Sequence, residues 1–282
     1  MWLNKDPFDL ENYHLGLPYS ICLLVFLSAH EFGHYFAAKN HGMKSTLPFY
    51  IPVPPFLINP FGTMGAVIRI KSPWTSRKSL FDVGIAGPIS GLIIALIILL
   101  YGLLTLPDKD YLLSIHPEYV SMQNIPETGL RLGDSIFFLW IRKTFSSVGF
   151  IPPMNEIYHY PFLCVGWFGL FVTTLNLIPI GQLDGGHIIY AMIGSRLQGI
   201  ISRFFFVILV IIGIANFAQY IGWNIQIGSA GWLLWAIILY FIIKLDHPEI
   251  PVNDELSIGR KILGWTMFIV FILTFVPSPF SE

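Results

Sequence analysis

Five long apolar stretches constrain what this chain can fold into more than any other feature of its sequence. They cover residues 15–38, 84–106, 201–221, 228–244 and 261–277. About 20 apolar residues in a helix cross the hydrocarbon core of a bilayer, where a helix satisfies its own backbone hydrogen bonds. Hydrophobic residues make up 54% of the chain and charged residues only 12%, unlike a soluble domain. We therefore expect an all-α polytopic membrane protein, with residues 1–282 forming a single integral membrane domain.

A further apolar segment, residues 47–70, cannot form an ordinary membrane helix. It contains five prolines, each of which removes a backbone hydrogen-bond donor from a helix. Irregular backbone is tolerated at membrane depth only where protein or a water-filled cavity satisfies it. We expect a re-entrant β-hairpin in which Gly62 and Gly65 help to make the turn and residues 66–70 form a strand. The alternative is a surface loop whose apolar side chains dip into the lipid headgroups.

The segment 161–193 is too long for one membrane span. As a straight helix it would be about 50 Å long, and its only ionisable residues are Asp184 and His187. Broken membrane helices often lie at binding or catalytic sites. Counting this segment, we expect about six transmembrane helices, one of them broken. The expected break falls at Pro179, Gly181, Gly185 and Gly186.

The distribution of Lys and Arg predicts the orientation of the spans. With the N-terminus outside, eleven of the 16 basic residues fall on inner connections and five on outer ones. Because basic connections face the cytoplasm, both termini should lie on the outer face. The outer loop 107–157 contains an apolar stretch, 130–145, with the spacing of an interfacial helix. The acidic start of the chain and the lack of a transit peptide favour a bacterial plasma membrane and no cleaved signal.

Three ionisable residues interrupt the first apolar stretch in the sequence HEFGH, residues 30–34. Each such group at the centre of a membrane helix costs about 2.5–3.5 kcal/mol, and such groups are functional by default. His30 and His34 lie one helical turn apart and can share one metal, and Glu31 is placed to act as general base. The alternative is that the three side chains only pair with one another inside a helix bundle.

A hydrolytic zinc site takes three protein ligands and keeps a fourth position for water. Asp184 is the preferred third ligand because it lies at membrane depth on the broken segment, and His187 is the second choice. Cys22 and Cys164 are isolated in apolar stretches and suit neither a disulfide framework nor a thiolate metal site. The remaining histidines lie near span ends or in loops: His14, His41, His116, His159 and His247.

The sequence HEFGH combined with NLIPIGQLDGGH, residues 176–187, resembles the site-2 protease family of intramembrane zinc metalloproteases. The second stretch matches the family pattern N-x-x-P-x-x-x-L-D-G, and GIAGPISG at 84–91 and the Gly-containing hairpin are also similar. Taken alone, the small residues of GIAGPISG indicate only close helix packing. The likeness covers about residues 20–195. We therefore expect a catalytic core at 15–195, with spans 1 to 3 and the hairpin 47–70, followed by three additional spans at 196–282.

The resemblance implies specific roles for residues of this chain. Glu31 would be the base, and Asn176 would lie near the substrate or the developing oxyanion. Because a substrate helix must be unwound before cleavage, we expect the strand edge at Gly65, Ala66 and Val67 to hold it by β-addition. The resemblance also implies one zinc ion per chain, with the ligands His30, His34 and Asp184.

The expected function is a zinc-dependent endopeptidase that cuts single-span membrane proteins near the cytoplasmic side of the bilayer, as in regulated intramembrane proteolysis. Two alternatives stay open: a divalent-metal transporter that uses the same ligands, and an inactive relative that binds membrane helices. Transporters often contain internal repeats, and this sequence has none that we detect. With a net charge of -1, the chain lacks the basic footprint of a nucleic-acid binder. The sequence does not identify the substrate or the oligomeric state.

Overall fold

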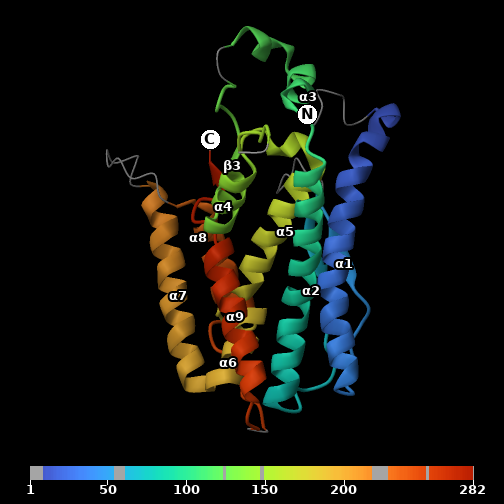
Figure 1. Ribbon diagram of the computed structural model, residues 1–282. Helices are drawn as coiled ribbons and strands as arrows, with labels where there is room; N and C mark the ends of the chain where they lie inside the picture. The colour runs from blue at the N-terminus through green and yellow to red at the C-terminus, as the bar shows by residue number, and fades with distance from the viewer. Residues whose placement is uncertain are drawn as a thin grey trace.

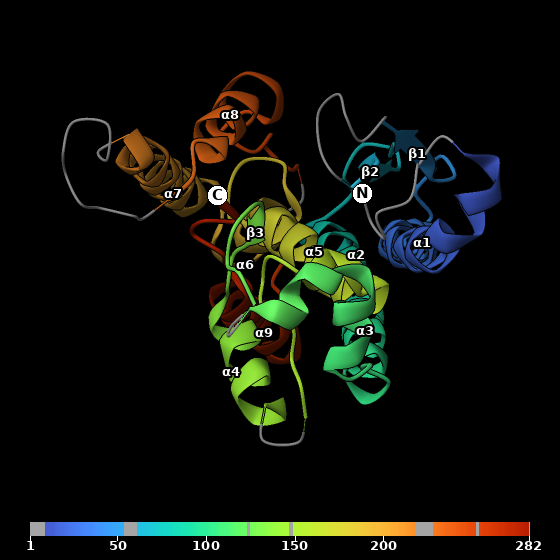
Figure 2. The same cartoon turned by 90° about the horizontal axis from the view of Figure 1, so that it is seen from above.

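Long helices that run side by side make up most of the structure, which is a computed structural model (Figure 1). The helical turn η1 (Leu10–Gly16) leads into α1 (Leu17–Asn40), which packs along α2 (Arg77–Leu104). On its other side α2 contacts α5 (Pro161–Leu177) and α6 (Asp184–Ile193). Seen from above, α2 and α5 lie between α1 and the C-terminal helices (Figure 2). The structure describes residues 9–53, 61–122, 125–146, 149–217, 228–251 and 254–281.

Three helical segments are long and apolar enough to cross a membrane: Glu11–Asn40, α2 and α7 (Ser195–Ala215). The other apolar helices are shorter. The helices α5 and α9 (Ile258–Thr274) have 17 residues each, and α8 (Gly231–Ile238) continues into the π-helical η5 (Leu239–Ile243). A helix of 17 residues is about 26 Å long, a little less than the hydrocarbon thickness. Length and composition therefore support three spans among the described residues, and the count of six stays a prediction.

The helix α2 begins seven residues before the predicted span, at Arg77. The cause is a capping box at Ser76, whose hydroxyl accepts a hydrogen bond from the backbone N–H of Ser79 at 3.1 Å, while the hydroxyl of Ser79 accepts one from the backbone N–H of Ser76 at 3.0 Å. The first turns of α2 are therefore charged. Asp82 pairs with Arg260 at 2.7 Å and with His41 at 2.9 Å. These contacts join α1, α2 and α9 at the end of the bundle where α1 ends.

The predicted break in segment 161–193 is confirmed. The helix α5 ends at Leu177 and α6 begins at Asp184, with Pro179 and Gly181 in the connection. Gly181 has a φ of +53°, a conformation that favours glycine. Gly186 and Gly185, also expected in the break, lie instead in the first turn of α6. A Cβ on Gly185 would collide with the carbonyl of Leu177. The missing side chain of Gly185 lets α6 fold back against the end of α5 and places Asp184 at the helix start.

The proline-rich segment does contain an antiparallel pair of strands, β1 (Phe49–Pro52) and β2 (Thr63–Val67). The strand β2 begins three residues before the predicted 66–70 and ends at Val67, after which a single bridge joins Ser45 to Ile70. Gly62, with a φ of +76°, borders the turn as predicted. Gly65 instead lies inside β2 with a φ of +101°, where the register shifts. Most of the turn, residues 54–60, lies outside the described residues.

The α2–α5 connection, residues 105–160, lies at the end of the bundle where α1 begins (Figure 1). It contains α3 (Lys109–Ile115), η2 (Pro117–Ser121), β3 (Arg131–Leu132), α4 (Ile136–Phe145) and η3 (Ile157–His159). The helix predicted for 130–145 is therefore shorter. Its first residues form β3, which pairs with β4 (Phe280–Ser281), and Ser135 caps α4 by accepting a hydrogen bond from the N–H of Phe138.

Candidate active site

Two imidazoles and a carboxylate from distant parts of the chain meet inside the helix bundle. His30 and His34 come from α1, and Asp184 comes from the first turn of α6. The Nε2 atoms of the two histidines are 3.1 Å apart, and Oδ2 of Asp184 lies 3.4 Å from that of His30 and 3.3 Å from that of His34. The histidine side chains are buried and that of Asp184 is nearly so. The structure thus brings together the three predicted ligands, named here the α1–α6 cluster.

The spacing of the α1–α6 cluster fits a zinc ion. In a tetrahedral site with zinc–ligand distances of about 2.0–2.1 Å, neighbouring ligand atoms are about 3.3 Å apart. All three separations in the cluster lie within a few tenths of an ångström of that value. Two imidazole nitrogens and one carboxylate oxygen are also a ligand set of catalytic zinc, which leaves a fourth position for water or substrate.

Hydrogen bonding orients His34 toward the cluster. Its Nδ1 lies 2.7 Å from the carbonyl oxygen of Val83 in α2 and can only donate there. The lone pair is therefore on Nε2, which is the atom that faces His30 and Asp184. Nδ1 of His30 is buried and has no hydrogen-bond partner among the described residues. The ring of His30 is held by packing instead, since a Cβ on Gly91 would lie only 3.0 Å from that nitrogen.

Glycines of α2 provide the space that the site histidines occupy. A Cβ on Gly87 would collide with the imidazole of His34, and one on Gly84 would lie 2.8 Å from Cβ of His187. The sequence analysis assigned these small residues to helix packing only. They do pack closely, but the neighbours of Gly87 and Gly91 are the imidazoles of His34 and His30, whereas Gly84 faces His187 outside the cluster. The sequence does contain a signal for this arrangement. The second span has a small residue on each turn, and the first span has a pair of ionisable residues that need space against a neighbouring helix.

Glu31 and Asn176 border the α1–α6 cluster. Glu31 is 8% exposed, and the backbone of Ile68, just after β2, lies within hydrogen-bonding reach of its carboxylate. Nδ2 of Asn176, near the end of α5, lies 3.2 Å from Nε2 of His30. The amide of Asn176 therefore lies beside one predicted ligand, and Glu31 directly follows that ligand in α1. Their roles as donor and base stay predictions.

The hairpin lies against α1, beside the candidate site (Figure 2). The hydroxyls of Tyr50 in β1 and Ser28 in α1 are 2.7 Å apart and join the two elements. Ala66 and Val67 pair with β1 on one edge of β2, and no described strand pairs with the other edge. The side chain of Val67 is 49% exposed. Of the predicted substrate-binding residues, Gly65 forms the bulge, and Ala66 and Val67 lead directly to Ile68 beside Glu31.

His187, the second choice as third ligand, is not brought into the cluster. Its Nδ1 lies 2.8 Å from Nε2 of His247, and its ring packs against Trp74 with the centroids 5.2 Å apart. Nδ1 of His247 donates to the carbonyl of Pro248 at 2.7 Å, so Nε2 accepts from His187. Burial lowers the pKa of His247, which favours its neutral form. The two rings therefore form a neutral hydrogen-bonded pair.

Comparison with known proteins gives a consistent result. The family model described as Peptidase family M50 matches residues 18–218. The chain is 26% identical over 283 residues to the probable zinc metalloprotease EGY2 of Arabidopsis thaliana, covering 98% of this chain and 44% of that protein. It is 30% identical over 267 residues to the probable zinc metalloprotease EGY1 of Oryza sativa subsp. japonica, covering 93% and 41%.

The chain thus spans less than half the length of these relatives. Both relatives are named as chloroplastic proteins. The sequence led us to expect a bacterial plasma membrane, a location that these names do not support.

Proposed function

Because the chain belongs to peptidase family M50, the site-2 protease family, we propose that it is a zinc-dependent endopeptidase acting inside the membrane. The observation that carries this proposal is the convergence of His30, His34 and Asp184 at the separations of a zinc ligand set, with Glu31 beside them. Such an arrangement serves hydrolysis, since three protein ligands leave one position open and a carboxylate is at hand to move protons.

In the proposed reaction, this chain's own residues bind, orient and move protons. Zinc, when bound by the three ligands, supplies a Lewis acid that polarises the peptide carbonyl and makes water easier to deprotonate. Glu31 accepts a proton from the attacking water and delivers it to the nitrogen of the leaving amine. The amide of Asn176 donates a hydrogen bond to the carbonyl oxygen, where negative charge develops. The amide nitrogen of Asn176 lies 3.2 Å from Nε2 of His30, and this distance supports the proposed role.

The proposed substrates are single-span membrane proteins, and the proposed contact is the free edge of β2. A transmembrane helix hides its carbonyls in internal hydrogen bonds, so the segment to be cut must be extended. An exposed strand edge binds an extended segment through backbone hydrogen bonds. The edge formed by Ala66 and Val67 runs toward Ile68 and Glu31, so a segment paired with it would reach the base. This role requires the hairpin to be re-entrant, as the sequence predicts.

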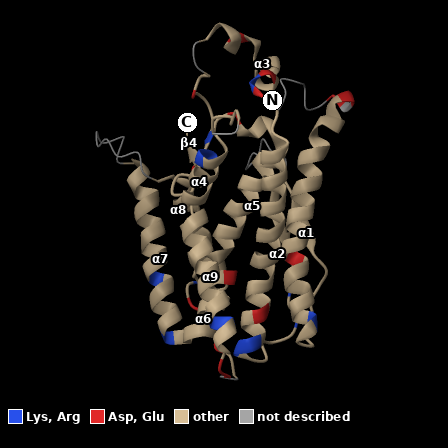
Figure 3. Ribbon diagram, in the orientation of Figure 1, with Lys and Arg blue, Asp and Glu red and all other residues tan. Residues whose placement is uncertain are grey.

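We further propose that the site lies on the cytoplasmic side of six spans, with the N-terminus outside. Lys and Arg gather toward the end of the bundle where α1 ends and α2 begins (Figure 3), as the positive-inside rule requires of a cytoplasmic face. The residues of the site come from α1, α5 and α6, within the core expected at 15–195. On this proposal the helices of 196–282 are additional spans that cover the core.

Replacement of Glu31 by Gln tests the function. The amide keeps the shape of the side chain but cannot take a proton, so cleavage of a single-span reporter in proteoliposomes should fall by roughly 100-fold or more. Zinc content, measured by elemental analysis, should not change. The matched control is Glu11→Gln, at an exposed glutamate of η1. Cleavage by Glu31→Gln at the wild-type rate would refute the proposal, and zinc flux into the vesicles that survives the substitution would favour a transporter.

A further inference from the structure

A second group of two histidines and one carboxylate lies at the opposite end of the bundle, in the α2–α5 connection. It consists of His116, which follows α3, and of Glu156 and His159, which precede α5. The Nε2 atoms of the histidines are 3.0 Å apart, and Oε2 of Glu156 lies 3.2 Å from that of His159 and 3.8 Å from that of His116. These separations centre on the same value of about 3.3 Å that a tetrahedral zinc site requires. We name this group the connection cluster.

One carboxylate oxygen of the connection cluster is buried without a hydrogen-bond partner among the described residues. Oε1 of Glu156 accepts hydrogen bonds from the hydroxyl of Tyr119 and the amide of Asn155, both at 3.0 Å. Oε2 is buried and faces the two imidazoles, yet it has no hydrogen-bond partner among the described residues. The whole side chain is only 3% exposed. A buried carboxylate is costly unless its charge is balanced and its oxygens are satisfied, and a bound metal ion would do both.

The surroundings of His116 also suit a metal ligand. Its Nδ1 lies 2.8 Å from a carboxylate oxygen of Glu118 and donates to it, which leaves the lone pair on Nε2. A carboxylate bonded to the outer nitrogen of a histidine is the usual second partner of a metal-bound imidazole. The ring of Tyr119 stacks on His116 with the centroids 4.6 Å apart. The hydroxyl of Tyr119 donates to Oε1 of Glu156, which leaves Oε2 facing the imidazoles.

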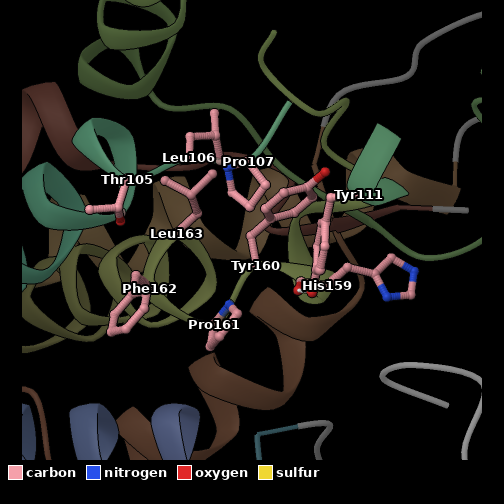
Figure 4. Close-up of a pocket in the computed structure, with 10 residues that line it drawn as sticks. Thr105, Leu106, Pro107, Tyr111, His159, Tyr160, Pro161, Phe162 and Leu163 are labelled. Atoms are coloured by element: carbon pink, nitrogen blue, oxygen red, sulfur yellow. Dashed lines mark hydrogen bonds between the residues drawn. The ribbon is translucent and has the colours of Figure 1, made fainter. Parts of the chain in front are cut away.

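The cluster is separate from the pocket that lies next to it. That pocket, of about 160 Å³, is lined by Gly102 of α2, the residues 105–107 that follow α2, Tyr111, and residues 159–163 around the start of α5. The backbone of His159 borders it, and its carbonyl accepts a hydrogen bond from Tyr111. In Figure 4 the imidazole of His159 points away from this pocket. The three ligand atoms therefore face one another, outside the pocket.

We propose that the connection cluster binds a divalent metal ion of the zinc class. Two imidazole nitrogens and one carboxylate oxygen suit zinc and its neighbours, whereas calcium and magnesium prefer oxygen ligands. The ion has a structural role, because it joins the end of α3 to the start of α5 across about 40 residues of chain. Wild-type protein thus holds two zinc ions, and the motif of the first span accounts for only one of them. This inference is independent of the proposed proteolysis.

The test is elemental analysis of zinc in the purified full chain, exchanged into chelator-free buffer. Wild type should contain two zinc ions, His34→Ala one, His116→Ala one, and the double variant none. His14→Ala, at an exposed histidine that hydrogen-bonds only its own helical turn, is the matched control and should retain two. Wild type with one zinc that is lost in His34→Ala would overturn the proposal, and so would two zinc ions in His116→Ala.

A second measurement tests the same proposal without relying on alanine variants that fold poorly. In the His34→Ala background, added Co²⁺ should give the visible absorption bands of a tetrahedral N/O site, and His116→Gln should abolish them while keeping the size of the side chain. Zinc should also raise the thermal unfolding midpoint of His34→Ala but not of the His34→Ala, His116→Gln double variant. Absence of the bands in a His34→Ala protein with a normal unfolding transition would show that the cluster is only a hydrogen-bonded network.

Discussion

The α1–α6 cluster and the connection cluster have the same ligand types at nearly the same separations, but their neighbours differ. The first lies between helices from distant parts of the chain, beside Glu31, Asn176 and the end of β2. The second lies within one connection, where Glu118 and Tyr119 are already bonded to the ligands themselves. On our two proposals, a set of ligands selects a metal, whereas a nearby base, an amide donor and access to an extended substrate decide whether the metal has any chemistry to perform.

Replacement of the carboxylate ligand at the α1–α6 cluster should have the largest effect. Asp184→Asn keeps the shape but loses the charge that balances the metal, so cleavage of a single-span reporter should fall by roughly 1,000-fold, and one zinc ion should be lost. Asp246→Asn, at a 64% exposed aspartate paired with Arg203, is the control and should stay near wild type. Full zinc content in Asp184→Asn would remove Asp184 from the ligand set.

The next largest effect should come from filling the space that Gly87 leaves for the imidazole of His34. In Gly87→Ala the new methyl group would overlap the imidazole of His34. Overpacking of this kind costs about 1–3 kcal/mol, so zinc affinity at the α1–α6 cluster should fall by roughly 10- to 100-fold while the connection cluster keeps its metal. Competition with a chelator measures the zinc affinity of each of the two clusters. The control is Gly259→Ala at the start of α9, where a Cβ meets nothing within 4 Å. Equal zinc affinity in Gly87→Ala would show that α2 does not fix His34.

A smaller effect should separate substrate binding from metal binding. Val67→Asp places a charge on the exposed edge of β2 and should weaken strand addition, lowering cleavage by roughly 5- to 10-fold with zinc content unchanged. The comparable substitution Val120→Asp, at a 69% exposed valine of η2, is the control. Normal cleavage by Val67→Asp would exclude the edge of β2 as the substrate contact.

The smallest effect should be on the pH dependence of stability. It concerns His187 and His247, the histidine pair that has no carboxylate partner. Burial lowers the pKa of His247, so the unfolded chain binds a proton more readily than the folded one does. Stability is therefore complete above the unfolded pKa of about 6.5 and declines as the pH falls below it. The decline of the thermal unfolding midpoint between pH 7 and 5 should be smaller in His247→Gln than in wild type. Identical slopes would show that the pair does not titrate on unfolding.

The sequence was most informative where chemistry is encoded over a few residues. HEFGH predicted two ligands and a base because helical spacing places i and i+4 on one face, and membrane burial made the charges conspicuous. Asp184 followed from its position on a segment that glycine and proline must break. The start of α2 was missed because its cap pairs two serines, and the apolar pattern gives no sign of a helix that extends through Arg77 and Lys78.

The connection cluster shows the other limit of sequence reasoning. His116 and His159 were set aside because they lie near span ends or in loops, and in the sequence they are 43 positions apart. They meet because the connection folds back so that the residue after α3 lies against the residues just before α5, and this depends on tertiary packing. The same reason explains Gly87, whose partner is an imidazole of another helix. Local spacing predicts ligands that share a helix, but long-range pairs require the fold.

The turn that carries Asp184 rests on a part of the chain outside the family match, which ends at residue 218. A Cβ on Gly181 would collide with the carbonyl of Lys244, and the amide of Gln182 donates to the carbonyl of Ile243 at 3.3 Å. Both partners lie at the end of the α8–η5 helix. The turn that leads to Asp184 therefore packs against residues beyond the matched region, and a protein shortened to that region would keep the three predicted ligands but lose these contacts of the turn.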